Sequence, residues 1–480
     1  MSISNALNNA ITGLSANGRA AQTVSNNLSN ALTDGYARRE LEVSAREGGG
    51  VRIDAEVRIL DRVALGDRRF ADADVSRGSA QLGFLTAAQD RIGEPGSGQA
   101  LSDRVTELET ALIAAAVSPS SNAVLEQTVT GFKRLATQLA DTSGAIQQER
   151  MRADANISEA VGQLNSDLGR IERLNLDIQA AVLRGGSGGA LLDERQRTID
   201  RVSALIQVRE VARDNGAVAL MGESGVVLDG PAPTIGFTAS GIITENMSLA
   251  GGTLSGLTFN GAPLDLARDK HALSGGQLEG LFEVRDRLAP QAQARLDGFA
   301  RDLIERFEAP GVDTTIGPTD PAILTDGGLR FDPANEVGLS RRLAVNAAVD
   351  PAVGGEAWRL RDGMGAAGPG DVGMSAGIAR LGEALSIQQS PVSGGFDASS
   401  RTSAGLAAAV LTSVSTLRDA TEADIAGSRA RSTALTERLQ ADGVDSDAEM
   451  QRLMLIEQAY AANAKVISAA QAMLDMLMEI

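Results

Sequence analysis

The chain has 480 residues, no cysteine, a single histidine and a formal net charge of −18. Without cysteine it cannot form disulfides, thiolate metal sites or cysteine nucleophiles, and one histidine excludes a histidine cluster or triad. The negative charge opposes binding to nucleic acid phosphates and anionic membranes, so we expect no nucleic acid partner. No run of about 18 apolar residues occurs, so we expect no membrane insertion, and residues 1–15 do not read as a cleaved secretory signal.

The first segment predicts a helix over residues 2–32 that ends before Gly35, a residue suited to a left-handed helix cap. Apolar residues recur along it in steps of mostly three, four or seven, at Leu7, Ile11, Leu14, Ala21 and Leu28. This pattern indicates a narrow apolar seam that needs another helix to cover it. Residues 39–62 alternate polar and apolar side chains, which predicts extended structure.

The middle of the chain predicts long helices interrupted by one β segment. Residues 157–182 keep a period near 3.5, with Asn175 as the polar member of the seam. Between residues 207 and 266, short Val, Ile, Leu and Thr runs are split by repeated turn residues, which indicates a small all-β module. Helices are predicted over 72–92, 100–117, 122–183, 191–206, 276–308, 375–389 and 399–439, with a mixed, loop-rich segment over 309–372.

The last segment predicts a helix from residue 446 to 480. Ser446 and Glu449 have the spacing of a capping box, in which both side chains accept from free amide groups. Its apolar residues again form a seam, at Leu453, Ile456, Tyr460, Ile467, Leu474 and Leu477. Because the two seams lie at opposite ends of the chain, we predict that the first and last helices pair.

The predicted fold is mainly α, with paired N- and C-terminal coiled-coil helices, an elongated helical bundle and a small inserted all-β domain. We predict three domains: residues 1–60 with 441–480, residues 61–206 with 271–440, and residues 207–270. Such a chain has the layout of a building block for self-association.

No constellation in the sequence supports catalysis, and we expect neither a cofactor nor a metal site. His271 reads as a surface or turn residue. The Gly-rich stretches at 185–189 and 223–225 lack the Walker spacing with Lys and Ser or Thr. Asp445 and Asp447 lie at a helix start, where negative charge favours the helix dipole.

Residues 24–38 resemble the N-terminal motif of the bacterial flagellar rod, hook and hook-associated proteins, roughly Asn-Ile-Ala-Asn-Ala-x-Thr-x-Gly-Tyr. The matching residues are Asn27, Asn30, Ala31, Thr33, Gly35 and Tyr36, with Leu28 in place of the usual Ile. Residues 449–450 and 458–467 resemble the C-terminal motif of the family. Arg38 and the segments 171–178, 191–196 and 275–286 are similar to the hook-associated members.

The resemblance implies a structural subunit that joins hook to filament, is exported without signal cleavage and resides in the extracellular flagellum. It implies a ring of identical copies, contacts with the hook protein and the next hook-associated junction protein, and an export chaperone at the C-terminal region. The expected assembly interface comprises Leu7, Ile11, Leu14, Ala21, Asn27, Leu28, Asn30, Gly35, Tyr36 and Arg38 at the N-terminus. At the C-terminus it comprises Leu453, Ile456, Tyr460, Asn463, Ile467, Leu474 and Leu477.

Three alternatives remain open from the sequence. A rod or hook subunit would share both terminal motifs, but usually lacks the long central heptads of residues 157–182. A coiled-coil scaffold inside the cell would show the same terminal seams. An enzyme with an unrecognised site is disfavoured by the single histidine and the absence of cysteine.

Overall fold

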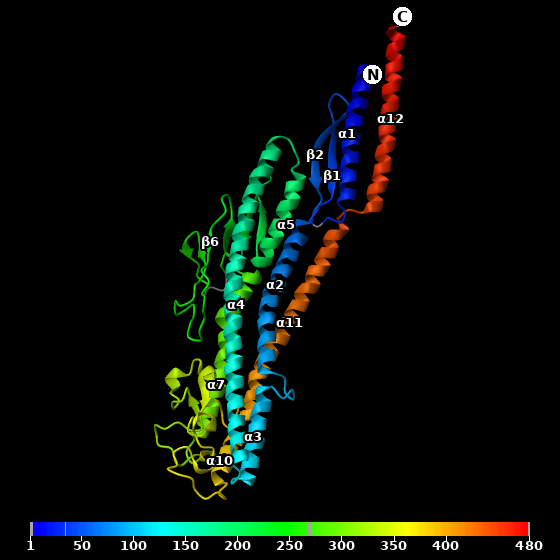
Figure 1. The fold of residues 1–480 in the computed structure, drawn as a ribbon. Coiled ribbons are helices and arrows are strands. Elements are labelled where there is room, and N and C mark those ends of the chain that lie inside the picture. The colour runs from blue at the N-terminus through cyan, green and yellow to red at the C-terminus, as the bar shows by residue number, and fades with distance from the viewer. Residues whose placement is uncertain (1–2, 34, 267–270, 479–480) are drawn as a thin grey trace.

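The computed structural model describes residues 3–33, 35–266 and 271–478. Long helices run along one axis, and α1 (Ile3–Ser29) and α12 (Ser446–Met478) lie side by side at one end of the molecule (Figure 1). The predicted mainly α fold, elongated and with a small β insertion, is confirmed. The boundaries of the three domains stay a prediction.

The two ends of the chain form what we call the terminal unit, made of α1, α12 and an antiparallel hairpin. The hairpin strands are β1 (Arg39–Ala45) and β2 (Val51–Arg58). Its turn packs on α1, where the amide of Val51 donates to Thr12 Oγ1 at 3.2 Å. The extended structure predicted after the first helix is therefore present, and it supports one side of α1.

The helical bundle continues from the terminal unit. Helix α2 packs along α11, while α3 and α5 pack on the 62-residue helix α4 (Figure 1). A further helical stretch packs against α2 and α4, and a five-residue π turn at Val284–Leu288 joins its two parts. The helices are α2 (Arg62–Ile92), α3 (Leu101–Val117), α4 (Asn122–Leu183), α5 (Gly189–Leu205), α6 (Gly276–Glu283), α7 (Ala289–Phe307), α10 (Ala376–Ser386) and α11 (Ser403–Ala441).

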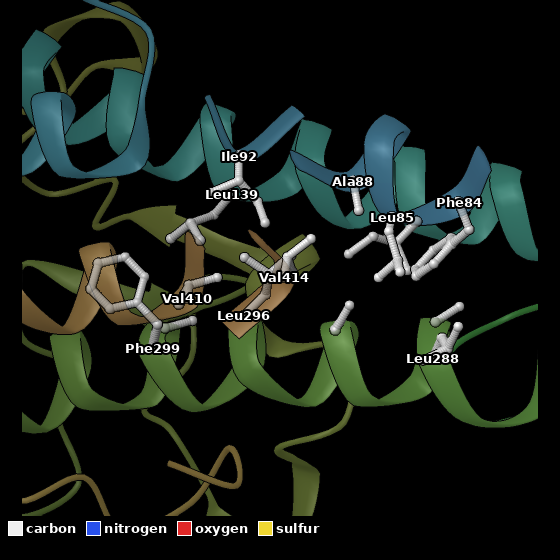
Figure 2. Packing of buried hydrophobic residues seen from close by; sticks show 14 of the residues in the cluster. Phe84, Leu85, Ala88, Ile92, Leu139, Leu288, Leu296, Phe299, Val410 and Val414 are labelled. Atoms are coloured by element: carbon white, nitrogen blue, oxygen red, sulfur yellow. The ribbon is translucent and has the colours of Figure 1, made fainter. Parts of the chain in front are cut away.

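The core of the bundle is apolar and continuous along these helices. Figure 2 shows Phe84 and Leu85 of α2 near Leu288, and Val410 of α11 near Phe299 of α7. All five side chains are buried. Burial of a Leu, Val or Phe side chain stabilises a fold by about 1.5–3 kcal/mol, so this shared core fixes the bundle.

The β insertion forms two three-stranded antiparallel sheets among the described residues, in the orders β3-β4-β5 and β6-β7-β8. Polar side chains of α4 fasten it by bonding strand backbone. Asn175 donates to Val218 O at 2.9 Å and accepts from Val218 N, and Asn165 bonds both backbone groups of Ile235. The strands are β3 (Arg209–Ala212), β4 (Val218–Gly222), β5 (Gly225–Leu228), β6 (Ile235–Gly236), β7 (Thr258–Phe259) and β8 (Ala262–Pro263).

The predicted mixed segment 309–372 contains short elements joined by turns. Strands β9 (Leu324–Asp326) and β10 (Leu343–Val345) pair antiparallel. Helices α8 (Leu339–Arg342) and α9 (Arg359–Asp362) have four residues each.

One predicted helix start and one predicted helix cap are wrong. Helix α2 begins ten residues before the predicted residue 72, because Asp61 accepts from the amides of Val63 and Ala64 and caps it. Helix α12 is not capped by the predicted box. Asp445 accepts there from the amides of residues 447 and 448, which leaves Glu449 free for another partner.

Candidate assembly interface

Helices α1 and α12 approach closely at a glycine. A Cβ atom on Gly13 would come 2.8 Å from Nδ2 of Asn463, closer than ordinary contacts allow. The buried positions of α1 are small or polar except for one valine; they are Ala10, Gly13, Ala16, Thr23, Val24 and Asn27. Small residues suit this helix because it packs between α12 and the hairpin.

The larger apolar residues of the predicted N-terminal seam lie at the edges of this contact. Leu7, Leu14 and Ala21 are half-buried, whereas 51% of Ile11 and 38% of Leu28 is exposed. The predicted seam therefore differs from the buried line of α1. The three-residue spacing of Ala10, Gly13 and Ala16 is a signal in the sequence that could have located that line.

The predicted seam of α12 also contains both half-buried and exposed residues. Leu453, Ile456, Asn463 and Ile467 are half-buried, and α1 is the main packing partner of this helix. Tyr460 and Leu474 are exposed, and the side chain of Leu477 lies outside the described residues. The large apolar side chains exposed along α12 are Met450, Met454, Leu455, Tyr460, Val466, Met473, Leu474, Met476 and Met478.

Asn27 organises the N-terminal motif as a latch between α1 and β1. It is fully buried, and its Oδ1 accepts from the Tyr36 hydroxyl at 2.8 Å and from the Arg39 amide at 3.0 Å. Its Nδ2 donates to the Arg39 carbonyl at 2.9 Å. Burial raises the pKa of Tyr36, against the opposing effect of the Arg39 guanidinium, so the hydroxyl stays a donor at neutral pH.

Two other motif residues shape the turn after α1. Gly35 has φ of 75°, a left-handed conformation that favours glycine, as predicted. A Cβ there would also lie 2.6 Å from Arg197 Cγ of α5. Asn30 makes only a local hydrogen bond at the surface, in which its Nδ2 donates to the carbonyl of Asn26 at 2.9 Å.

Ion pairs join the N-terminal motif to the start of α12. Arg38 lies 3.4 Å from the buried carboxylate of Glu449 and 3.0 Å from Glu40. Arg452 in turn pairs with Glu40 at 2.9 Å. The pairs Arg38–Glu449 and Arg452–Glu40 link residues more than 400 positions apart and place the two terminal motifs against each other.

A second set of ion pairs joins the terminal unit to the bundle. Asp193 of α5 pairs with Arg39 at 2.6 Å and with Arg58 at 2.7 Å. Arg438 of α11 pairs at 2.7 Å with Asp61, which caps α2, so the link between the hairpin and the bundle is also held by a charged pair. Asp193 of α5 thus ties both strands of the hairpin to the bundle.

The described residues offer little for catalysis. They contain no group of three or more His, Cys, Asp or Glu placed to hold a metal ion. His271 is half-buried at a turn, where its amide donates to Ser274 Oγ, and burial lowers the pKa of its ring. Across 3–33, 35–266 and 271–478, none of the helices has the length and apolar content needed to cross a bilayer.

Comparison with known proteins gives two family matches. Residues 86–313 match the model of the flagellar hook-associated protein FlgK helical domain, and residues 436–480 match that of the flagellar basal body rod FlgEFG protein C-terminal region. Together they cover more than half of the chain. The chain is therefore similar, in two separate regions, to the bacterial flagellar rod, hook and hook-associated proteins, which are structural proteins of the flagellum.

Among these proteins, the chain is similar to flagellar hook-associated protein 1. It is 25% identical over 318 residues to that protein of Escherichia coli (strain K12), covering 64% of this chain and 56% of the relative. The Salmonella typhimurium protein is 24% identical over 320 residues, with the same coverage. The matched region thus spans little more than half of each relative. The flagellar hook junction protein FlgK of Burkholderia pseudomallei has a solved structure that matches with TM-score 0.45 and 19% identity, over 55% of this chain and 47% of that one.

Proposed function

We propose that the chain is a structural subunit of the junction between flagellar hook and filament. In this proposal, identical copies form a ring through their terminal units after export without signal cleavage. The subunit then contacts the hook protein on one side and the next hook-associated junction protein on the other. An export chaperone binds the C-terminal region before secretion, and the chain has no catalytic role.

The observation that carries the proposal is the exposed apolar surface of α12. One side of this helix packs on α1, yet nine large apolar side chains remain exposed along it, Leu455 at 66%. Exposed apolar side chains gathered on one element of this kind favour association with another protein surface. Ile11 and Leu28 of α1 add to the apolar surface of the same unit.

The similarity in residues 86–313 favours the hook-associated class over a rod or hook subunit, because the matching model describes the helical domain of a hook-associated protein. The same match disfavours an unrelated scaffold inside the cell. The expected interface residues remain proposals, and the exposed ones, such as Tyr460 and Leu474, are those available to a second copy.

The location is tested by tagging the chain in cells and finding the tag by electron microscopy. We expect the label between hook and filament; label along the rod or in the cytoplasm would refute the junction role.

The assembly surface is tested by Leu455→Glu, which places a charge on the exposed side of α12 without disturbing a core. We expect a folded monomer by circular dichroism and loss of ring formation by light scattering and electron microscopy. Leu329→Glu makes the same chemical change at a residue that is 73% exposed near β9, far from α12 in sequence and in the fold. It should assemble normally. Normal rings with Leu455→Glu would contradict this role for α12.

A further inference from the structure

A cavity of about 420 Å³ lies where the terminal unit meets the bundle. Its wall is formed by the end of β2, the start of α2, one side of α5 and strand β3. The charged residues of this wall are Arg58, Arg62, Arg69, Arg195, Arg209, Glu56, Asp67 and Glu210. Arginine outnumbers carboxylate here, although the whole chain carries a net charge of −18.

Arg195 is the central residue of this cavity, because it is a buried cation with neutral partners. Only 5% of it is exposed, and its Nη1 donates to Asn175 Oδ1 at 2.9 Å and to the Gly216 carbonyl at 2.7 Å. Among the described residues no carboxylate lies within ion-pair distance of it. Burial lowers the pKa of Arg195 to about 10, with Glu210 opposing this effect, so the group stays charged at neutral pH.

Arg69 lies in the same wall but, unlike Arg195, has carboxylate partners. It is equally buried, but it has ion pairs with Asp200 at 2.7 Å and Glu210 at 3.1 Å. A buried charge without a counter-ion is costly unless an opposite charge joins it. The positive charge of Arg195 is therefore uncompensated, and an anion bound in the cavity would stabilise it.

The rim of the cavity supplies further cationic groups. Arg62 and Arg209 are exposed, and neither has an ion pair within the part of the chain that the structure describes. The Arg209 guanidinium lies 4.9 Å from the centre of the Phe70 ring, so an aromatic side chain lies beside this cation. Guanidinium groups match the two oxygens of a carboxylate better than a point charge does.

Apolar side chains complete the wall, among them Val57, Leu60, Leu192 and Val208. Such a wall suits a ligand with an apolar body and one charged end, and the volume is in the range of small-molecule sites. We propose that this cavity binds a carboxylate carried on an apolar stem, with Arg195 as its inner partner. The inference does not rest on the junction role. The carboxylate can come from a free organic acid or from an acidic side chain of a second copy.

The probe for the test is para-fluorobenzoate, observed by fluorine NMR with the full-length monomer, and para-fluorobenzamide is its neutral analogue. We expect the acid to bind and the amide to bind at least about tenfold more weakly, because one charge-assisted contact is lost. Arg195→Met should weaken acid binding by about tenfold or more. Equal binding of acid and amide would overturn the proposal.

A second variant keeps the test valid if Arg195→Met does not fold. Gly66 lines the cavity and a Cβ on it meets nothing within 4 Å, so Gly66→Phe fills space without removing charge. Gly83→Phe is its matched control, since Gly83 lies on the same helix, also faces open space and is not part of the wall. Binding should be lost with the first and kept with the second; retained binding in Gly66→Phe would overturn the proposal.

An assembly assay on Gly66→Phe and Gly83→Phe distinguishes the two sources of the carboxylate. If a second copy supplies the group, Gly66→Phe should prevent ring formation while Gly83→Phe assembles. If a free organic acid is the ligand, both variants should assemble and only the probe affinity should differ.

Discussion

Asn27→Ala tests the latch between α1 and β1 that joins the N-terminal motif. The change deletes hydrogen bonds to the Tyr36 hydroxyl and to both backbone groups of Arg39. The backbone groups should cost about 1–2 kcal/mol each when left without this partner. Tyr36 is half-buried, so water can replace its hydrogen bond and we add nothing for it. The sum is about 2–4 kcal/mol.

The assay is amide hydrogen exchange followed by mass spectrometry. Because opening free energies differ among parts of a protein, we expect the loss to be local to the terminal unit. A loss of about 2–4 kcal/mol corresponds to exchange about 30- to 900-fold faster in residues 3–58. Exchange in α4 and α7 should be unchanged, since the bundle core does not include Asn27.

The matched control is Asn26→Ala, which removes the same side chain from an exposed position one residue away. It should leave exchange nearly unchanged. Tyr36→Phe should give a smaller effect than Asn27→Ala, because it deletes only one of the three bonds. Equal exchange in the Asn26 and Asn27 variants would refute the latch.

Three further predictions follow from other contacts. Gly13→Ala should fail to gain the roughly 1 kcal/mol that alanine gives in a helix, because the new methyl meets Asn463; Asn463→Ala should restore that gain in thermal unfolding. Asn175→Ala should lower the free energy of unfolding in urea by about 2–4 kcal/mol, because three buried hydrogen bonds are lost. Glu40 has a pKa below its ordinary value of 4.5 because Arg452 hydrogen-bonds its carboxylate. That pair should therefore stabilise the terminal unit above about pH 4.5, and the stabilisation should be lost as the pH falls through the lowered pKa.

Each of these has a control. Gly18→Ala, where a Cβ meets nothing within 4 Å, should be stabilising, and a similar gain at Gly13 would show that the helices are not in close contact. Leu176→Ala changes an exposed neighbour of Asn175 and should cost little; an equal cost would contradict the role of the asparagine. Glu40→Gln should reduce the change in the melting temperature of the terminal unit between pH 6 and pH 3, as measured by calorimetry. An unchanged pH profile would exclude Glu40 as the cause.

The long helices could be predicted from the sequence because their periodicity is local. The bounds of α4 agree with the prediction at both ends, since Ser121 and the Gly run after residue 184 interrupt a regular pattern. The start of α2 and the cap of α12 differ from the prediction, because an aspartate one residue before each helix supplies the cap. A cap depends on local geometry that composition does not fix.

The pairing of the chain ends was predicted, but the contact face of α1 was not. The apolar periodicity used for the prediction selects large apolar residues. In the structure, α1 approaches α12 through Gly13, and Ile11 stays exposed. Close approach favours small side chains, and a single sequence does not show how near a partner will come. Asn27 could be predicted only as part of a motif, because two of its three hydrogen bonds go to the backbone of Arg39, twelve residues further along.

The bundle lowers the affinity that α1 and α12 must have for each other in order to pair. Helix α11 leads through four residues into α12, and the hairpin connects α1 to α2, which packs along α11. The two terminal helices therefore meet as tethered segments, at a local concentration set by short connections instead of by the number of molecules in solution. A helix pair too weak to form between free peptides can be populated in this setting, and its outer apolar side stays available for other copies.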